Sequence, residues 1–427
     1  MTVWTVKNEA AYRVKLRHPW VYRDEIKKAA SLPHPGAPVE LQNEKGEVIA
    51  RGYGNIESKL SFRALSYGSE SGNPTSEESV LYKLIRAWTQ KRELGFLSSL
   101  RICFGEGDQL PGLVIDFYEV GGETPAQALA VQVLTAGMDS ILRKAPDLFK
   151  NLIDRAYEKK LCPYSWEKTA LIFRNDVRVR ELEGLRKEEP RFAQTVREVN
   201  WSRAPVLLNS YDWNSQISLF CDLYQGQKTG LFLDQSHNIS TVLRFLNLNH
   251  KQKNLKVLDL CSYVGHWSAQ FADWGLKNKT DIEITQMDIS AQALGFAKDN
   301  ASSAKSIEVI QQDVLEDWSL TEKSFDVVIA DPPAFVKSAK DIDKGLSAYI
   351  RLNSEAIKRV KVGGYLVACS CSGLVTKDAF DQAISKSFIR SGRRGNLILR
   401  GGNAWDHTAL LEFPEGQYLK MSLFKVN

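Results

Sequence analysis

The feature that most constrains this chain is a series of strand-like segments in its C-terminal half, each ending in an acidic residue. Val257-Leu258 leads into Asp259, and later segments of the same kind end near Asp288, Gln312-Asp313 and Asp331. The strand-like segments alternate with helix-like sequence, which is typical of an α/β fold with a parallel sheet. In such sheets, ligands bind in the crevice at the carboxyl ends of the strands. The sequence therefore predicts a ligand-binding crevice lined by four acidic strand ends.

The loop after the first of these strands argues against two common nucleotide sites. Cys261-Ser262-Tyr263-Val264-Gly265 has one glycine, whereas a dinucleotide fingerprint needs three spaced glycines. A triphosphate-binding loop is also absent at Gln227-Lys228-Thr229, because the required glycine five residues before Gly226 is missing. A carboxylate such as Asp288 can accept hydrogen bonds from both hydroxyls of a ribose. We therefore expect a nucleoside ligand that needs no pyrophosphate cradle.

Length and sequence texture divide the chain into three predicted domains. With 427 residues, the chain is too long for a single ordinary core. Short β-like runs occupy residues 1–72, a mixed α+β pattern occupies 73–190, and the α/β pattern occupies 191–427. Near the C-terminus, Leu410–Phe413 and Tyr418–Met421 flank Pro414-Glu415-Gly416 and predict an antiparallel hairpin.

Composition limits the compartment and the partners of the protein. The six cysteines of so long a chain do not form a disulfide framework, and no zinc-ligand pattern accompanies them. No apolar run reaches the length of about 18 residues that a transmembrane helix needs. We therefore expect a cytoplasmic protein that binds neither a metal nor a membrane. A net charge of +5 permits a polyanionic partner without requiring one.

Six motifs, in order along almost the whole chain, resemble one enzyme family. They are His18–Tyr22, Gly105–Leu113, Gly226–Gln235, Asp331–Phe335, Ser370–Gly373 and Pro414–Lys420. Together they resemble the PUA-containing 23S ribosomal RNA methyltransferase I family, which makes 5-methylcytidine. That family belongs to the class I S-adenosylmethionine-dependent methyltransferases. The resemblance implies a Rossmann-like methyltransferase domain with a C-terminal antiparallel hairpin, a central α+β domain and an N-terminal PUA-like RNA-binding domain. It also implies S-adenosylmethionine as cofactor and large-subunit ribosomal RNA as partner.

The acidic strand ends and the resemblance together define a predicted cofactor site. Its residues are Gln235, Asp259, Ser262, Tyr263, Gly265, Asp288, Asp313 and Asp331. Among them, Asp288 suits the ribose diol and Asp313 suits the adenine amino group. Two positions depart from the family pattern: Gly107 stands where the family often has alanine, and His266 stands where the family's Ser-Tyr-Thr-Gly-Gly motif ends in glycine. His266 places a side chain near the methionine end of the cofactor, and we expect binding to survive both departures.

The reaction implied by the resemblance needs a thiolate. Cytosine C5 is a poor nucleophile, and addition of a thiolate to C6 supplies the electrons that it lacks. The resemblance assigns this nucleophile to Cys371, just after a predicted strand, whereas Cys369 is expected to be a buried structural residue. Asp331 is expected to accept from the cytosine amino group, and Pro332 and Pro333 stiffen its loop. Amino-group methyltransferases also use an Asp-Pro-Pro loop, usually with an aromatic residue next, so that alternative stays open.

Basic and aromatic residues alternate near the N-terminus, a pattern that suits RNA phosphates and bases. From this cluster we predict RNA contacts by Arg17, His18 and Trp20, with a solvated charged surface as the alternative. Lys228 lies in the block 226–235, which we expect to fold over the cofactor. Lys228 is predicted to contact RNA or the methionine carboxylate, or else to be an ordinary surface lysine.

Three functions are consistent with these residues. The first is RNA cytosine-5 methylation. The second is methylation of a guanine nitrogen, in which Cys371 would be structural. The third is a non-catalytic RNA-binding assembly factor, against which the presence of Asp288, Asp331 and Cys371 argues. The sequence leaves the oligomeric state open, with a homodimer as one alternative.

Overall fold

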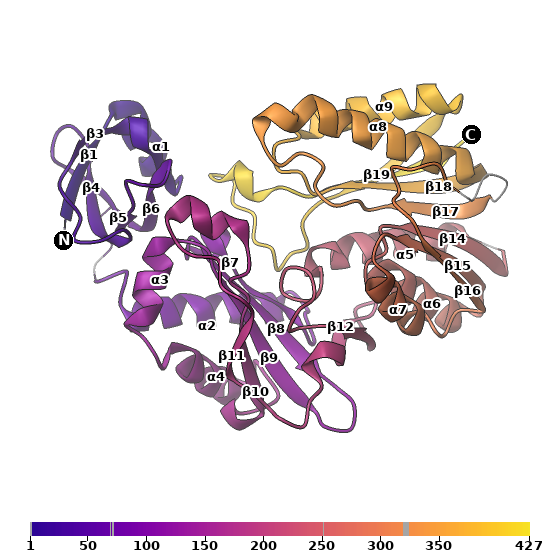
Figure 1. Ribbon diagram of the computed structural model, residues 1–427, viewed down its shortest axis with the longest axis horizontal. Coiled ribbons are helices and arrows are strands. Elements are labelled where there is room, and N and C mark those ends of the chain that lie inside the picture. The colour runs from indigo at the N-terminus through magenta and orange to yellow at the C-terminus, as the bar shows by residue number, and fades with distance from the viewer. Residues whose placement is uncertain (1, 69, 71, 251, 319–323) are drawn as a thin grey trace. The chain divides into compact units, whose positions relative to one another are not determined.

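The computed structural model describes residues 2–68, 70, 72–250, 252–318 and 324–427 and divides into two compact units (Figure 1). Unit 1 comprises Met1–Ala204, Asp222–Leu231 and Trp405–Gly416, and unit 2 comprises Pro205–Cys221, Phe232–Ala404 and Gln417–Asn427. The predicted boundaries at residues 72 and 190 both lie within unit 1, and the three-domain division stays a prediction. No helix in the described part of the chain is long and apolar enough to cross a membrane.

The first part of unit 1 is a small β-rich domain. Its six strands follow the order β2-β6-β5-β4-β1-β3. The elements are β1 (Thr2–Val6), α1 (Asn8–Lys15), β2 (Trp20–Tyr22), β3 (Ile26–Ala29), β4 (Ala37–Gln42), β5 (Val48–Gly54) and β6 (Leu60–Tyr67). Alternate residues of β4, including Val39 and Leu41, join Trp4 and Phe62 in a closed core. This is the β-rich domain that the sequence predicts.

The central part of unit 1 is a second sheet with helices. Its elements are α2 (Glu77–Glu93), β7 (Leu100–Phe104), β8 (Leu113–Val120), β9 (Ala126–Val133), α3 (Ala136–Arg143), α4 (Leu148–Glu158), β10 (Thr169–Phe173) and β11 (Arg191–Gln194). Strands β11, β10, β9 and β8 are neighbours in that order, and β7 pairs with β8. Every residue of β9 is buried, as expected for a strand inside a sheet with both faces covered.

Two segments from the C-terminal half are fixed to this central part by buried polar contacts. Thr229 Oγ1 donates to Asp116 Oδ2 at 2.5 Å, and Arg101 donates to the same carboxylate through Nε and Nη2, each at 2.7 Å. The Arg101 backbone N–H donates to Asp406 Oδ2 at 2.8 Å, and Thr408 Oγ1 donates to Asp108 Oδ1 at 2.9 Å. Removing the Asp406 carboxylate would leave the buried Arg101 backbone N–H without this acceptor, which is costly. These contacts explain why the Asp222–Leu231 and Trp405–Gly416 segments belong to unit 1.

The hairpin predicted at Leu410–Met421 is wrong in its strands. Leu410 and Phe413 form only an isolated antiparallel bridge, and Pro414–Gly416 is a 3₁₀ turn. The antiparallel pair at the end of the chain is instead β19 (Gly395–Gly401) with β20 (Lys420–Val426). The physical reason is tertiary, because the segment before residue 417 is held in unit 1 by the contacts described above.

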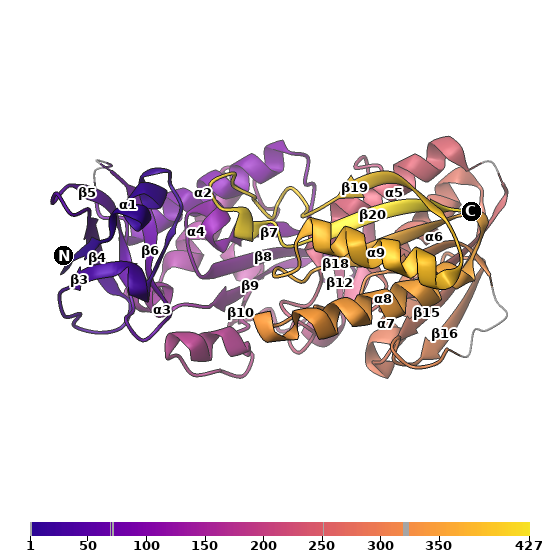
Figure 2. The ribbon, with the colours of Figure 1, turned by 90° about the horizontal axis from the view of Figure 1, so that it is seen from above.

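Unit 2 is a seven-stranded sheet covered by helices on both faces. Its strand order is β16-β15-β14-β17-β18-β20-β19. After β12 (Ala204–Asn209) and β13 (Gln216–Cys221), the elements are α5 (Ser236–Asn249), β14 (Asn254–Leu260), α6 (His266–Asn278), β15 (Asp281–Asp288), α7 (Ala291–Asn300), β16 (Ser306–Gln311), β17 (Phe325–Ala330), α8 (Ile342–Arg359), β18 (Val360–Ser370), α9 (Lys377–Ser391), β19 and β20. Helices α8 and α9 lie side by side over one face, as Figures 1 and 2 show from two directions.

The residue pattern of the strands accounts for this double cover. Leu255 and Val257 of β14 belong to a core that includes residues of α5 and α6. Leu258 and Leu260, on the opposite side of the same strand, belong to a core that includes residues of α8 and α9. A parallel strand buried on both faces gives the nearly continuous apolar run seen in the sequence.

The strand order creates a switch point at β14. Strand β14 lies between β15 and β17 and is parallel to both, so the chain leaves it first towards one edge of the sheet and then towards the other. Ligands of open α/β sheets bind at such a point, outside the carboxyl ends of the strands. Asp259, Asp288 and Asp331 lie at those ends in β14, at the end of β15 and just after β17. The predicted α/β fold is therefore confirmed.

Candidate cofactor and catalytic site

The turn between β14 and α6 is tightly wound. Cys261, Tyr263 and Gly265 have positive φ angles of 59°, 48° and 78°. A Cβ atom on Gly265 would lie 2.9 Å from Ala297 Cα and 3.0 Å from its Cβ, so this position requires glycine. Gly265 is also the N-cap of α6 and offers no side chain to the first N–H groups of the helix. The first backbone N–H groups of α6 therefore lie at the place where the sequence predicts that a nucleoside ligand binds.

Asp288 fixes the same turn from the neighbouring strand. Its Oδ2 accepts from the Tyr263 backbone N–H at 2.9 Å, and its Oδ1 accepts from the Ser290 backbone N–H at 2.9 Å. The side chain is half-buried. Each carboxylate oxygen can accept more than one hydrogen bond, so both keep capacity for a ligand diol.

Asp259 is a buried carboxylate whose hydrogen bonding is incomplete. Its Oδ2 accepts from Ser268 Oγ at 2.6 Å, whereas its Oδ1 has no partner among the described residues. Burial raises the pKa of Asp259 to about 7, and the nearby Asp331 carboxylate adds to the rise. Ser262 Oγ is also buried without a partner in the described part of the chain. Incomplete pairing of this kind fits a site completed by a polar, cationic ligand group such as an amino group.

Two further predicted positions take defined places near this turn. Asp313 follows β16, and its Oδ1 accepts from the Leu315 backbone N–H at 2.8 Å, which fixes the loop at that strand end. His266 is the first residue of α6 and is buried. Burial lowers the pKa of His266 to about 4, so the imidazole is neutral at pH 7 and adds no charge at this position.

Asp331 is held from both sides by donors of other elements. Gln235 Nε2 donates to Oδ1 at 2.8 Å, and Trp267 Nε1 donates to Oδ2 at 3.1 Å. Gln235 is itself oriented, because its Oε1 accepts from Asn238 Nδ2 at 2.7 Å. Gln235 was predicted from the sequence, but Trp267 was missed. The one feature of the sequence that could have indicated Trp267 is its position in the first turn of α6, directly after the loop that ends at Gly265.

The two neighbouring cysteines occupy different environments. Cys369, in β18, is completely buried, and burial raises the pKa of its thiol well above the usual value. Cys371 follows β18 and is half-buried. Its thiol donates a weak hydrogen bond to the Pro332 carbonyl oxygen, with 3.8 Å between Sγ and O. Cys371 is therefore the thiol beside the Asp331-Pro332 loop, and Cys369 is a core residue.

A buried hydroxyl network joins the loops that carry Asp331 and Cys371. Tyr349 of α8 lies with its hydroxyl 2.9 Å from both Ser370 Oγ and Ser372 Oγ. Ser372 Oγ also accepts from the Val336 backbone N–H at 3.2 Å. The loops after β17 and β18 are thus tied to each other next to the two residues predicted to be catalytic.

The predicted RNA contacts do not form one exposed surface. Trp20 Nε1 donates to Glu106 Oε1 at 2.8 Å, and the Trp20 ring lies edge-to-face with Phe413 at a centroid distance of 4.6 Å. The half-buried His18 ring also lies against Phe413, at 5.8 Å. Both aromatic residues therefore make structural contacts inside unit 1. Base stacking by His18 and Trp20 stays a prediction, but it would require these contacts to change.

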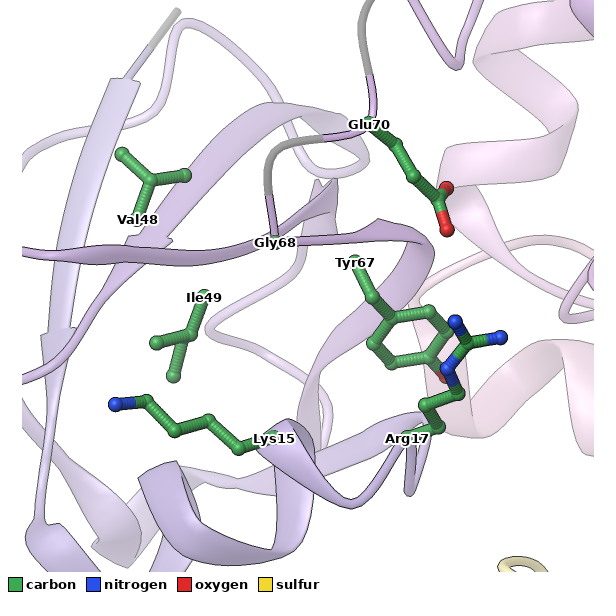
Figure 3. A pocket seen from close by; sticks show the side chains of 7 residues that line it. All are labelled: Lys15, Arg17, Val48, Ile49, Tyr67, Gly68 and Glu70. Atoms are coloured by element: carbon green, nitrogen blue, oxygen red, sulfur yellow. The ribbon is translucent and has the colours of Figure 1, made fainter.

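Arg17 has a different environment on the β-rich domain. It is exposed and lines a pocket, together with Lys15, Val48, Ile49, Tyr67, Gly68 and Glu70. Figure 3 shows the Arg17 guanidinium beside the Tyr67 ring, whereas Lys15 extends below Ile49, away from that ring. A cation next to an aromatic ring is a combination that suits a nucleotide phosphate and base.

The block 226–235 is divided between the two units. Lys228 is exposed on a turn in unit 1 and has a positive φ of 53°, whereas Gln235 belongs to unit 2. The block is therefore not a single local element. The predicted contact of Lys228 with RNA or cofactor stays a prediction.

Comparison with family models and solved structures identifies the class of this protein. Residues 5–67 match a PUA-like domain, and residues 251–408 match a methyltransferase domain. A solved structure from Streptococcus mutans, described as an S-adenosylmethionine-dependent methyltransferase, aligns with a TM-score of 0.73 at 16% identity and covers 100% of both chains. Another structure with the same TM-score is described as a methyltransferase complexed with SAH. The chain thus carries an N-terminal PUA-like domain and a methyltransferase domain.

Curated relatives that align over almost the whole chain are named as methyltransferases of ribosomal RNA. Over 421 residues, 95% of this chain and 94% of the relative, the protein is 28% identical to "Ribosomal RNA large subunit methyltransferase I" of Alteromonas mediterranea. The protein of the same name from Pseudoalteromonas translucida is 28% identical over 424 residues, 97% of this chain and 96% of that protein. The resemblance predicted from the six sequence motifs is confirmed by these full-length alignments.

The raised pKa of Asp259 predicts a pH dependence of cofactor binding. Below about pH 7 the Asp259 carboxyl is protonated and neutral, so it no longer forms an ion pair with the positively charged amino group of the cofactor. Affinity for S-adenosylhomocysteine should therefore fall as the pH decreases below 7, by up to about tenfold per pH unit. Titration calorimetry from pH 5.5 to 8 checks this. The slope should flatten in Asp259→Asn and persist in Asp313→Asn, and an unchanged slope in Asp259→Asn would contradict the assignment.

Proposed function

We propose that the protein methylates C5 of a cytidine in large-subunit ribosomal RNA, with Cys371 as the nucleophile. The observation that carries the proposal is the position of Cys371, half-buried just after β18, with its thiol against the Pro332 carbonyl. The neighbouring Asp331 carboxylate is oriented at the cofactor end of the sheet. The choice of ribosomal RNA rests on the names of the curated relatives.

The residues present fit the chemistry of cytosine. Bound S-adenosylmethionine supplies an electrophilic methyl group on its sulfonium. The Cys371 thiolate adds to cytosine C6, and the C5–C6 π electrons form the new bond from C5 to the methyl carbon as the bond from methyl to sulfur breaks. A base then removes the C5 proton, and the electrons of that C–H bond restore the C5–C6 double bond and expel the thiolate.

Asp331 is proposed to hold the cytosine during this addition. Gln235 and Trp267 fix its two carboxylate oxygens, so the group enters the reaction already oriented. A carboxylate oxygen can accept from the C4 amino group while a proton on N3 compensates the charge that builds up when the thiolate adds. Asp331 therefore acts on the base, and Cys371 acts on its C6.

Transfer of tritium from labelled cofactor to bulk ribosomal RNA, followed by nucleoside analysis, tests the function. Label in 5-methylcytidine supports the proposal. Label in a methylated guanosine would replace it with the nitrogen-methylation alternative. RNA binding without label would leave the non-catalytic assembly factor.

We also propose that the PUA-like domain contributes RNA contacts through Lys15 and Arg17. These two cations line the pocket of Figure 3. Lys15 pairs there with Glu47 at 3.0 Å, but both side chains are exposed, so this ion pair is weak and a phosphate can compete for the lysine. Arg13 is instead paired with the less exposed Glu25 at 2.6 Å. The double change Lys15→Gln and Arg17→Gln should weaken RNA binding and reduce the slope of log affinity against log salt by about 0.7–0.9 for each lost phosphate contact.

Filter binding at several salt concentrations checks this prediction. Lys150→Gln, on the exposed surface of α4, is the matched control and should leave the slope unchanged. Because the β-rich domain donates buried hydrogen bonds to the central part, such as Tyr53 to the Pro111 carbonyl at 2.7 Å, point variants are preferable to deleting residues 1–72. An unchanged slope in the double variant would assign the RNA contacts elsewhere.

Two further properties are part of this proposal. We propose a cytoplasmic location, and the support is that the curated relatives are named as ribosomal RNA methyltransferases. We also propose a homodimer, the oligomeric state that the sequence leaves open as one alternative. Light scattering at working concentration distinguishes a dimer from a monomer.

A further inference from the structure

Lys420 lies at the start of β20, directly opposite Ser370 at the end of β18. Its Nζ donates to the Ser372 carbonyl oxygen at 2.7 Å and to the Val375 carbonyl oxygen at 2.8 Å. Both carbonyls belong to the loop between β18 and α9 that begins with Cys371. One half-buried ammonium group therefore holds this loop at two points.

The lysine and the cysteine also interact electrostatically. Burial lowers the pKa of Lys420 to about 8, and the negative charge of an ionised Cys371 raises it. The same coupling acts in reverse, because a nearby cation favours the thiolate over the thiol. Cys371 also interacts with Tyr349 of α8 and Cys369 of β18, whose raised pKa values, due first to burial, keep both neutral near pH 7.

The acidic crevice disfavours negative charge on a neighbouring thiol. Burial raises the pKa of the Cys369 and Cys261 thiols, and the Asp331 carboxylate adds to both rises, with Asp288 and Asp259 adding at Cys261. A thiolate at Cys371, in the loop against Pro332, would form close to this negative edge. Lys420 approaches from the antiparallel strand and supplies a compensating charge.

We propose that Lys420 is a positioning residue that fixes the Cys371 loop and stabilises the Cys371 thiolate. The proposal rests on the proposed function, in which Cys371 is the nucleophile. Lys420 is the last residue of the Pro414–Lys420 motif. We have assigned it no contact with the cofactor or with RNA, so this proposal gives it a role. Lys420 acts through Cys371 and touches neither reactant.

Three variants separate charge from loop anchoring. Lys420→Gln keeps a hydrogen-bond donor but loses the charge, and Lys420→Arg keeps both. Lys425→Gln is the matched control, because Lys425 lies on the same strand and is exposed. The readout is the rate of alkylation of Cys371 by iodoacetamide from pH 6 to 10, with each cysteine peptide quantified by mass spectrometry.

We expect Lys420→Gln to raise the midpoint of the alkylation profile by about one pH unit or more, which slows alkylation near pH 7 about tenfold. Lys420→Arg should have a midpoint at or below that of the wild type, since the guanidinium stays charged throughout the range. Lys425→Gln should match the wild type. Cofactor affinity, measured by calorimetry, should stay within a few-fold in all three.

An unchanged midpoint in folded Lys420→Gln overturns the proposal, and so does equal slowing at every pH, which would show loop anchoring alone. If Lys420→Gln does not fold, a raised midpoint in Lys420→Arg overturns it. Alkylation does not depend on methyl transfer, so the two proposals fail separately. Normal turnover by Cys371→Ala would end the nucleophile assignment, whereas an unchanged alkylation profile with inactive Cys371→Ala would end only the role of Lys420.

Discussion

Cys371→Ala is expected to abolish methyl transfer while cofactor and RNA affinities stay within a few-fold of the wild type. The thiolate acts only in the chemical step, so its loss removes the addition to C6 without removing a binding contact. The side chain is half-buried, and its thiol makes a weak sulfur contact with the Pro332 carbonyl oxygen. The measurement is tritium transfer to ribosomal RNA alongside calorimetry with S-adenosylhomocysteine.

Cys369→Ala is the matched control, two residues earlier on the same strand. Because Cys369 is fully buried and burial keeps its pKa high, the thiol is not available as a thiolate. The variant should retain most activity and lose on the order of 1 kcal/mol of stability through the smaller core side chain. If folded Cys369→Ala were inactive, the result would contradict the assignment of Cys371 and favour Cys369 as the nucleophile.

Covalent trapping gives an independent result on the same residue. RNA containing 5-fluorocytidine should form a stable adduct with the wild type, because fluorine at C5 blocks the elimination that releases the thiolate. Peptide mass spectrometry should locate the adduct at Cys371. An adduct at Cys369 would keep the chemistry and correct the residue, whereas turnover by Cys371→Ala would favour nitrogen methylation.

The unit 2 fold was predictable because its signals are local. Strands β14 and β17 contain apolar runs, and the acidic residues at the ends of β14, β15, β16 and β17 lie within one or two positions of the strand boundary. Parallel strands align their carboxyl ends by geometry, so Asp259, Asp288 and Asp331 come together without any specific long-range contact. Cys371 lies at the same edge of the sheet, because it follows the carboxyl end of β18, which is parallel to β17.

The failures are all tertiary. The predicted Leu410–Met421 hairpin has suitable residues for two strands, but Asp406 and Thr408 are bound by the central part of unit 1. Trp20 has the composition of an RNA contact, yet Phe413, which is distant in sequence, packs against its ring. Trp267 was missed because nothing in its neighbours indicates that its indole N–H reaches Asp331. Contacts between residues so far apart leave no periodic signal in a single sequence.

Asp288→Ala is expected to weaken cofactor binding by roughly tenfold to several hundredfold. Its carboxylate has acceptor capacity for two ribose hydroxyls, and hydrogen bonds to a charged group contribute roughly 1.5–3 kcal/mol each, with tenfold in affinity for each ~1.4 kcal/mol. The change also removes the acceptor of the Tyr263 and Ser290 N–H groups, so the turn after β14 should loosen. Both effects act in the same direction on affinity. Titration calorimetry with S-adenosylhomocysteine measures the loss.

A control on the same strand separates the cofactor effect from damage to the sheet. Asp281 lies at the other end of β15, where its exposed carboxylate pairs with Lys305 at 2.6 Å. Asp281→Ala should bind the cofactor like the wild type, because exposed ion pairs contribute little to stability. Asp288→Ala should keep the unfolding transition of a folded protein, since its side chain is half-buried and lies at the edge of the sheet. Equal cofactor affinity in the two variants would remove Asp288 from the ribose site and leave it only the role of fixing the turn.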